Sequence, residues 1–319
     1  MKKTVAWLLA LASCFAGAAL AQSWPARPIK LEVPFAAGGN TDAVARIAAD
    51  RLTTLLGQPV LVENRAGASG AIAAEYVMRS APDGYTLFVG ATPNILVVPQ
   101  LNKVNYDWER DFVPVAIITT NPFVLGIHPT IGAKTLREFV DYAKARPGKL
   151  NYGSGGTGTI AHLSAALLVS RAGLVATHVP YKGGGPAVAD LVGGQLDFYF
   201  GNAAELIPHM RSGKVTVLAV SSEKRARELP DVPSVAETYP GFQTYTWNAL
   251  FAPAGTPRAI VERIAHEVGR AVKDPATVDR IQRIGSDPSG IALEEFTALI
   301  RREKPIWIEA VKAAGLKQE

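Results

Sequence analysis

A run of small and polar residues, Phe35-Ala36-Ala37-Gly38-Gly39-Asn40-Thr41-Asp42, is the first stretch whose composition could do chemistry. Its two glycines let the backbone take positive φ and come close to a ligand. Asn40 or Thr41 can cap a following helix, and Asp42 falls in its first turn. A helix N-terminus after such a loop presents free N–H groups and a positive dipole end, which suits an anion. The alternative is a plain strand-to-helix turn.

A second glycine loop spans residues 151–159, between a predicted strand and a predicted helix. Gly153, Gly155 and Gly158 satisfy the G-x-G-x-x-G spacing of dinucleotide-binding folds. The next strand, however, does not end in the acid that would bind a ribose, and Tyr181-Lys182 follow it instead. We therefore favour a second anion cradle, built from backbone N–H groups, a helix dipole and nearby hydroxyls. The hydroxyls are those of Ser154, Thr157 and Thr159. A plain turn remains the alternative.

Further candidates for the same site follow other predicted strands. The carboxyl ends of strands in an open α/β sheet form its ligand-binding edge. Ala68 and Ser69, Ala91 and Thr92, and Asn202 all lie in such positions. Tyr181 could form an aromatic wall, and His162 could donate to an anion from one turn into its helix. Histidines in such places are more often packed or capping residues.

Catalytic and metal-binding arrangements are not apparent in the sequence. There is no G-x-S-x-G elbow, and the five histidines show no H-E-x-x-H or other metal spacing. Ser69 and Ser154 lie in glycine loops, but the sequence pairs neither with a base. We therefore predict neither an enzyme nor a metal site, and no cofactor.

The elements that would position these loops alternate between strand and helix, which predicts an α/β protein with mainly parallel sheets. The predicted strands are 59–63, 86–90, 113–119, 123–128, 150–152, 177–179, 198–200 and 215–220, together with the one that begins at Leu31. The predicted helices are 71–80, 135–145, 159–172, 185–193, 202–212, 257–273, 276–284 and 293–314, together with the one that ends near Leu52.

Two apolar segments suggest where the chain crosses between two lobes. The strands on either side of Asn121-Pro122 lie nearly end to end, and 247–253 could carry the chain back. This predicts a first lobe of 22–121 plus 249–319 and a second lobe of 122–248.

The amino terminus has the parts of a secretory signal. Lys2 and Lys3 precede an apolar core, and Ala19-Leu20-Ala21 is a cleavage site, so residues 1–21 form the predicted leader. An alternative is lipidation at Cys14, which follows a lipobox-like sequence and is the only cysteine. Without the leader the charge falls from +5 to about +3, too mild for a nucleic-acid footprint. We predict an exported protein that does not bind nucleic acid.

Several long blocks, in order, resemble the Bug-type (TctC-like) extracytoplasmic solute-binding proteins of tripartite tricarboxylate transporters. They are PARPIKLEVPFAAGGNTDAVAR, LGQPVLVENRAGASG, APDGYTLFVG, LNYGSGGTGTIAHL, HVPYKGGGPAVADLVGGQLDF, LAVSSEKRARELPDVPSVAE and LFAPAGTP. The resemblance runs from Pro25 to about Ala314.

This resemblance implies a two-lobe periplasmic-binding-protein fold (type II), with a ligand cleft between lobes joined by two crossing strands. It implies a periplasmic monomer that captures a small organic carboxylate by hinge closure and delivers it to the membrane permease subunits of a tripartite transporter. The ligand residues that it implies are Phe35, Ala36, Gly38, Gly39, Asn40, Ala68, Ser69, Ala91, Thr92, Ser154, Thr157, Gly158, Thr159, His162, Tyr181 and Asn202.

The chain departs from the usual family pattern at Ala36-Ala37, at Trp247-Asn248 and at Gly201-Asn202. The third departure matters most, because many members have an aspartate where Gly201-Asn202 stands. Its absence favours a carboxylate ligand without an ammonium group. Two other functions stay open: a ligand sensor that signals to a membrane protein, and, more remotely, an exported hydrolase that uses Ser69 or Ser154.

Overall fold

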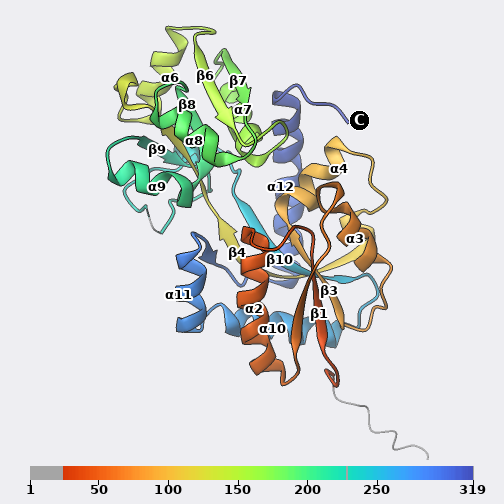
Figure 1. Cartoon of the computed structure of the whole chain (residues 1–319). Coiled ribbons are helices and arrows are strands. Elements are labelled where there is room, and N and C mark those ends of the chain that lie inside the picture. The colour runs from red at the N-terminus through yellow and green to blue at the C-terminus, as the bar shows by residue number, and fades with distance from the viewer. Residues whose placement is uncertain (1–23, 228, 319) are drawn as a thin grey trace, which may run out of the picture.

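The computed structural model describes residues 24–227 and 229–318 of the 319-residue chain, which form two β-sheets with helices packed around them (Figure 1). Each sheet with its helices is called a lobe below, lobe 1 for the first sheet and lobe 2 for the second. The predicted leader and Cys14 lie outside the described residues. No helix in 24–227 or 229–318 combines the length and the apolar character needed to cross a membrane.

The sheet of lobe 1 has six strands in the order β11-β4-β10-β3-β1-β2. Their bounds are β11 (Asp287–Pro288), β4 (Phe112–Asn121), β10 (Thr246–Pro253), β3 (Thr86–Ala91), β1 (Ile29–Val33) and β2 (Val60–Asn64). β1 pairs in parallel with β2 and β3, whereas β10 runs antiparallel to both of its neighbours. The register places Leu31 opposite Val62 and Leu87.

The sheet of lobe 2 has five strands in the order β7-β6-β8-β5-β9. Their bounds are β7 (Ala176–Pro180), β6 (Leu150–Ser154), β8 (Phe198–Asn202), β5 (Phe123–Ile127) and β9 (Thr216–Val220). β6 pairs in parallel with β7 and β8, and β5 runs antiparallel to β8 and β9.

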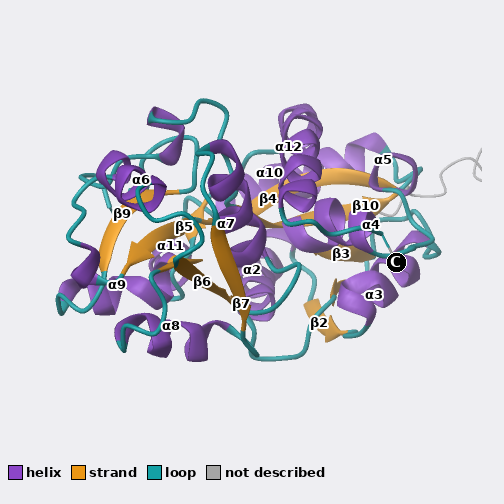
Figure 2. Ribbon diagram, turned by 90° about the horizontal axis from the view of Figure 1, so that it is seen from above, coloured by secondary structure: helices purple, strands orange, loops and turns teal. Residues whose placement is uncertain are grey.

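Helices lie on both sides of the strands, as the view from above shows (Figure 2). In the first part of the chain they are α2 (Asn40–Leu56), α3 (Ala71–Met78), α4 (Val98–Leu101) and α5 (Trp108–Asp111). Then follow α6 (Leu136–Lys144), α7 (Ile160–Arg171), α8 (Gly184–Val192) and α9 (Ala203–Arg211), and finally α10 (Arg258–Ala271), α11 (Pro275–Arg283) and α12 (Leu293–Ala313). Short turns are η1 (Ala68–Gly70), η2 (Pro93–Val97, a π-helical turn), η3 (Pro129–Ile131) and η4 (Val235–Glu237).

Strand alternation gives the sheet of lobe 1 a separate core on each face. Leu87 and Val89 pack into one cluster with α2 and α10, while Phe88 points to the other, which contains Phe112 and Phe251. Successive side chains of a strand point to opposite faces, so this division follows from the strand itself. Burial of a phenylalanine side chain contributes roughly 1.5–3 kcal/mol. The first cluster lies within lobe 1, whereas the second continues into lobe 2, where it includes Leu163 and Phe198.

The chain passes between the lobes at two neighbouring places. β4 belongs to lobe 1 and β5 to lobe 2, with only Pro122 between them. The return runs from β9 through residues 221–227 and 229–245, which include η4, to β10, whose Thr246 pairs with Asn121. Ser221 N–H donates to the Phe123 carbonyl at 2.8 Å, so the two crossings lie side by side.

α12 adds a third connection between the lobes. It packs on β4 in lobe 1 and on α7 in lobe 2 (Figure 1). Near its end, Glu309 forms a bidentate ion pair with Arg171 of α7, at 2.9 and 2.7 Å. The last turns of α12 therefore lie against lobe 2.

The two-lobe α/β prediction is confirmed, but the prediction of mainly parallel sheets is wrong. Both sheets are mixed, because β4, β5 and β10 run antiparallel to neighbouring strands. These are the strands next to the crossings. A chain that leaves one sheet and returns to it beside the same strand must run the other way on its return.

Candidate functional site

A cleft between the lobes contains two adjoining cavities. The main cavity has a volume of about 710 Å³, which lies within the range of roughly 300–1,000 Å³ that is usual for small-molecule sites. It is lined by Phe35, Ser69, Pro93, Val97, Val98, Leu101, Asn102, Phe123, Gly155, Thr157, Gly158, Thr159, Ile160, Ala161, Gly183, Gly184, Tyr199, Asn202, Glu205, Leu316 and Lys317. The inner cavity, of about 200 Å³, shares five of these residues and adds Asn40, Thr41, Ala91, Asn121, Thr246, Trp247 and Asn248. The loops that follow β1, β3, β6 and β8 thus meet here.

The first glycine loop is held in shape by a buried carboxylate. Asp42 accepts hydrogen bonds from the Gly38 N–H at 2.9 Å and from Asn64 Nδ2 at 2.9 Å, and it pairs with Arg46. Burial opposes the ionisation of Asp42, but the hydrogen bonds from Arg46, Gly38 and Asn64 outweigh it and lower its pKa. Asn64 Nδ2 also donates to the Phe35 carbonyl at 3.0 Å. An ionised Asp42 therefore fixes both ends of the loop.

We expect Asp42→Ala to lower the free energy of unfolding by about 1–3 kcal/mol at pH 7, because it leaves buried donors without an acceptor. The pKa of Asp42 is lower in the folded protein, so its contribution is complete above the ordinary pKa near 3.8 and is lost as the pH falls further. Urea unfolding at pH 7 and pH 3 would measure both effects. Asp50→Ala, which removes an exposed acid of the same helix, is the control. Equal losses in the two variants would contradict the assignment.

α2 begins without the predicted side-chain cap. Its N-cap is Gly39, which has no side chain to cap with. The Thr41 hydroxyl instead donates to Asn248 Oδ1 at 2.8 Å, and Asn40 Oδ1 accepts from Asn248 Nδ2 at 2.9 Å. Both side chains thus tie α2 to β10 beside the crossing. First-turn N–H groups have no intrahelical acceptor, so the start of α2 keeps the donors that an anion would need.

The second glycine loop supplies the floor of the main cavity from lobe 2. Thr157, Gly158 and Thr159 line it, and Thr159 also caps α7 by accepting from His162 N–H at 3.4 Å. The Thr159 hydroxyl donates to the Gly156 carbonyl at 2.7 Å. The Gly158 N–H donates to His162 Nδ1 at 3.0 Å. Thr159, which caps α7, and His162 therefore hold the loop in place.

His162 lies in that supporting layer and lines neither cavity. It is 3% exposed, and its ring stacks on the ring of His178 at 3.7 Å with an interplanar angle of 8°. Burial, and then the neighbouring His178, lower the pKa of His162 to about 4. Nδ1 acts as an acceptor for the Gly158 N–H, which a neutral ring allows. The structure therefore makes His162 a support of the loop and not a wall of the cleft.

The other predicted site residues divide between the cavities and the layer behind them. Ser69, Ala91 and Asn202 line one or both cavities, as do Phe35 and Asn40. Thr92 is buried, and its hydroxyl accepts from the Trp247 N–H at 3.0 Å. Tyr181 donates to Asp190 at 2.6 Å. The predicted residues that line neither cavity are Ala36, Gly38, Gly39, Ala68, Thr92, Ser154, His162 and Tyr181.

Sequence reasoning missed the wall formed by η2 and α4. Pro93, Val97 and Leu101 face the main cavity, and Asn94 Oδ1 accepts from the Ala91 N–H at 2.8 Å. The Tyr106 hydroxyl donates to the Asn94 carbonyl. The run Ile95–Val98 is the apolar signal that could have indicated a packed segment here.

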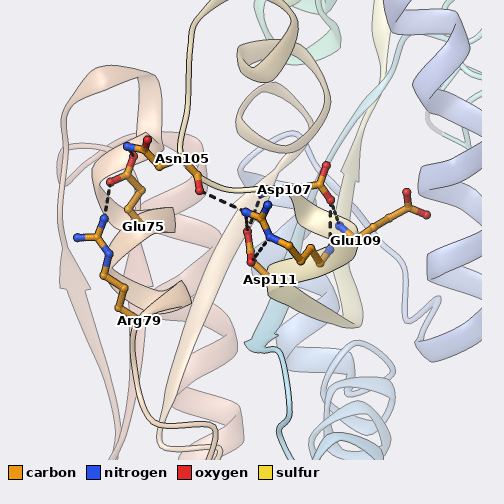
Figure 3. A network of polar contacts seen from close by, with 7 residues as sticks. Glu75, Arg79, Asn105, Asp107, Glu109 and Asp111 are labelled. Atoms are coloured by element: carbon orange, nitrogen blue, oxygen red, sulfur yellow. Dashed lines mark hydrogen bonds and ion pairs between the residues drawn. The ribbon is translucent and has the colours of Figure 1, made fainter.

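A polar network holds the loop that follows α4 (Figure 3). Asn105 Nδ2 donates to Glu75 of α3 at 2.9 Å, and Arg110 of α5 donates to the Asn105 carbonyl at 3.4 Å. Arg110 also pairs with Asp111 at 2.7 Å. The network links α3 to α5 through this loop. The apolar wall is therefore attached to lobe 1 from both sides.

Three of the other lining residues that were missed come from later in the chain. Glu205 reaches the main cavity from α9, and Leu316 and Lys317 reach it from the segment after α12. Gln318 Nε2 donates to the carbonyls of Pro99 and Asn102, at 3.3 and 3.4 Å. This segment therefore folds back along the edge of the cleft. Glu205 and Lys317 are the two charged residues among those that line the main cavity in the described part of the chain.

A serine and a histidine do lie together near the cleft. Ser154 Oγ is 2.6 Å from His178 Nε2. Ser154 is, however, fully buried, accepts from the Gly156 N–H at 3.1 Å, and lines neither cavity. Among residues 24–227 and 229–318, no group of three or more His, Cys, Asp or Glu side chains is placed to hold a metal ion.

Comparison with known proteins gives one consistent family. The model of the tripartite tricarboxylate transporter family receptor (TctC) matches residues 44–316. Protein BugT of Bordetella pertussis is 36% identical over 300 residues, which cover 93% of this chain and 92% of BugT. The solved structure of R. palustris Rpa4515 with adipate has a TM-score of 0.75 and 33% identity, over 93% of this chain and all of that one.

A second solved relative, MatC from Rhodopseudomonas palustris with bound malate, has a TM-score of 0.69 and 34% identity, over 90% of this chain and all of that one. Both solved relatives thus match nearly the whole length of this protein, including both lobes and the cleft between them. The chain belongs to the TctC family of periplasmic solute-binding receptors, and its fold is that of a two-lobe periplasmic binding protein.

Proposed function

We propose that this protein captures a small organic carboxylate in the cleft between its lobes and delivers it to the membrane permease of a tripartite transporter. The observation that carries the proposal is that the first residues of two helices, each preceded by a glycine loop, line the same inner cavity: Asn40 and Thr41 at the start of α2, and Ile160 at the start of α7. α2 contributes the first N-terminus and α7 the second. Helix N-termini favour anions. The relatives solved with adipate and with malate support a carboxylate.

Hinge closure fits the two neighbouring crossings at Pro122 and at 221–245. A ligand that contacts both lobes binds the closed state better than the open one, and this difference drives closure. We propose that the site residues are those predicted ones that line the cavities, with Glu205, Leu101 and Lys317 added. We further propose export through cleavage after Ala21 and action as a monomer.

We expect small carboxylates to raise the melting temperature of the protein that begins at Gln22. A ligand that binds only the folded state stabilises it by RT ln(1 + [L]/Kd), about 2.7 kcal/mol at a hundredfold excess over Kd. Thermal-shift measurement against mono-, di- and tricarboxylates, aromatic acids and amino acids tests this, with calorimetry for each hit. Protein freed of copurified ligand by unfolding and refolding is the control. Absence of binding by any acid to this refolded protein would contradict the proposal.

Delivery to a permease is tested separately from binding. Uptake of the bound acid by cells that carry the permease subunits should require this protein. Capture of membrane partners with and without ligand would distinguish this role from the alternative of a sensor. Recovery of a sensor protein in place of permease subunits would favour the alternative.

A further inference from the structure

We propose that Glu205 sets the ligand class of this protein: a carboxylic acid that also carries a hydrogen-bond donor, hydroxyl or ammonium, for the Glu205 carboxylate. The inference rests on the proposed function and narrows it. From the sequence alone, the absence of an acid at Gly201-Asn202, at the end of β8, favours a ligand without an ammonium group. The structure nevertheless places an acid close to this position. Glu205 lies one turn further along, on α9, and lines the main cavity.

The Glu205 carboxylate is held in place by lobe 2. The Tyr199 hydroxyl donates to Oε2 at 3.1 Å, and Tyr199 itself is 2% exposed. On the other side lies Gly184, at the start of α8. A Cβ atom at Gly184 would come within 2.6 Å of Oε1, so the carboxylate rests directly against the backbone there. A residue with a side chain at this position would displace it.

In the described part of the chain Glu205 makes no ion pair, although Lys317 also lines the main cavity. Burial raises the pKa of Glu205, while hydrogen bonds from the Tyr199 hydroxyl and from the Asn202 backbone lower it. No lysine or arginine in the described part of the chain contributes to the balance. Glu205 is an exposed residue, and it lines the main cavity. Apart from the Tyr199 hydroxyl and the N-termini of α8 and α9, the carboxylate is therefore left to water or to a ligand for its hydrogen bonds.

The chemistry of the partner follows from the chemistry of the carboxylate. An ionised glutamate only accepts hydrogen bonds, and Tyr199 occupies one of its acceptor positions. A ligand carboxylate placed beside it would be repelled, whereas a hydroxyl or an ammonium would complete its hydrogen bonding. The acid group of the ligand belongs instead with the two glycine loops. Glu205 would then discriminate between small acids by whether they carry a hydroxyl or an ammonium group.

The test uses acids that are matched in skeleton. For chains of four, five and six carbons, the plain dicarboxylate is compared with its 2-hydroxy and 2-amino forms: succinate, malate and aspartate, and the corresponding glutarate and adipate series. Calorimetry gives the dissociation constant of each with wild type, Glu205→Gln, Glu205→Ala and a control, Glu262→Gln. Glu262 is an exposed acid of α10 that pairs with Arg258, so the control has the same charge change.

We expect wild type to bind a hydroxy or amino acid about tenfold or more tightly than the plain dicarboxylate of equal length. Glu205→Gln and Glu205→Ala should remove most of this preference and leave the plain acid's affinity unchanged or improved. A larger loss for the amino form would identify an ammonium, and a larger loss for the hydroxy form a hydroxyl. The Glu262→Gln protein should match wild type. Circular dichroism confirms that each variant is folded.

Two results would overturn the inference. One is wild-type binding of plain dicarboxylates as tight as that of their hydroxy and amino forms. The other is a preference that Glu205→Gln and Glu205→Ala both leave intact. In either case the proposed function stands, because an acid still binds. If the refolded protein binds none of these acids or those of the wider panel, the proposed function fails, and this inference fails with it.

Discussion

Glu303→Gln should make the protein more stable at pH 8 than wild type, and nearly equal to it at pH 5. Glu303 lies on α12 and is 1% exposed. Burial raises its pKa to about 7, even though hydrogen bonds from Trp247 and Tyr245 favour its charged form. Glutamine has the same shape and cannot ionise. The substitution therefore removes the cost of a buried charge without opening a cavity.

The contacts of Glu303 explain why an ionisable group is retained there. Trp247 Nε1 donates to Oε2 at 2.9 Å, and Gln243 Nε2 donates to Oε1 at 3.4 Å. Both donors belong to the segment that returns from lobe 2 to lobe 1. No ion-pair partner appears for Glu303 in the described part of the chain, and Arg302 acts on it only at longer range. Glu303 thus attaches α12 to the return crossing through hydrogen bonds alone.

The direction of the pH effect follows from proton binding. Between the ordinary glutamate pKa near 4.5 and the folded value of about 7, the folded protein holds a proton that the unfolded chain has released. The free energy of unfolding therefore decreases as the pH rises through this window. One pKa unit corresponds to about 1.4 kcal/mol, so wild type should lose on the order of 3 kcal/mol relative to Glu303→Gln by pH 8.

Urea unfolding at pH 5, 6, 7 and 8 measures this difference, since groups that titrate alike in both proteins cancel. Glu262→Gln, with an exposed carboxylate, should show the wild-type pH dependence. If Glu303→Gln also showed the wild-type dependence from pH 5 to 8, Glu303 would have to titrate near its ordinary value. If the variant were less stable at every pH, the hydrogen bond from Gln243 would outweigh the buried charge.

Regular elements with strong local signals were predictable from sequence. α6 begins after Thr135, whose hydroxyl accepts from the Glu138 N–H at 3.2 Å. The sequence alone predicts this Thr cap. β4 and β5, on either side of Pro122, fall in different sheets. Strand direction was not predictable, because a buried strand has the same apolar run whether its neighbour is parallel or antiparallel. η2 and α4 also escaped prediction, since Pro93 and Pro99 suggest breaks in structure.

The site was predictable only in part, for a similar reason. Glycine loops are recognisable in the sequence, and residues of both predicted loops line the cleft. The role of Glu205 was not recognisable, because an acid in the first turn of a helix equally well complements the helix dipole. Only the rotation of α9 about its axis decides which way this side chain points. Lys317 depends on the path of the chain after α12, which Gln318 fixes through carbonyls of Pro99 and Asn102. Contacts between segments that are distant in the sequence are not indicated by the local sequence pattern of either segment.

Gly158→Val should abolish ligand binding while the protein remains folded. Gly158 lines the main cavity with a φ of +77°, and a Cβ atom there would lie 3.0 Å from Leu101 Cδ1 and 3.9 Å from Leu316 Cδ1. Valine must therefore push back the apolar wall of lobe 1 and the segment after α12. The backbone strain adds about 1–2 kcal/mol. We expect affinity for the acid series to fall by about a hundredfold or more, as measured by calorimetry.

Gly173→Val separates the loss of space from the strain. Gly173 has a φ of +63°, lies in an exposed turn after α7, and a Cβ atom there would meet nothing within 4 Å. Both variants should therefore lose similar stability, but only Gly158→Val should lose ligand. Equal ligand affinity in the two variants would mean that the acid does not occupy the space between Gly158 and Leu101. A cleft that binds by closing over its ligand cannot tolerate a side chain there, because the two lobes already approach each other at this point.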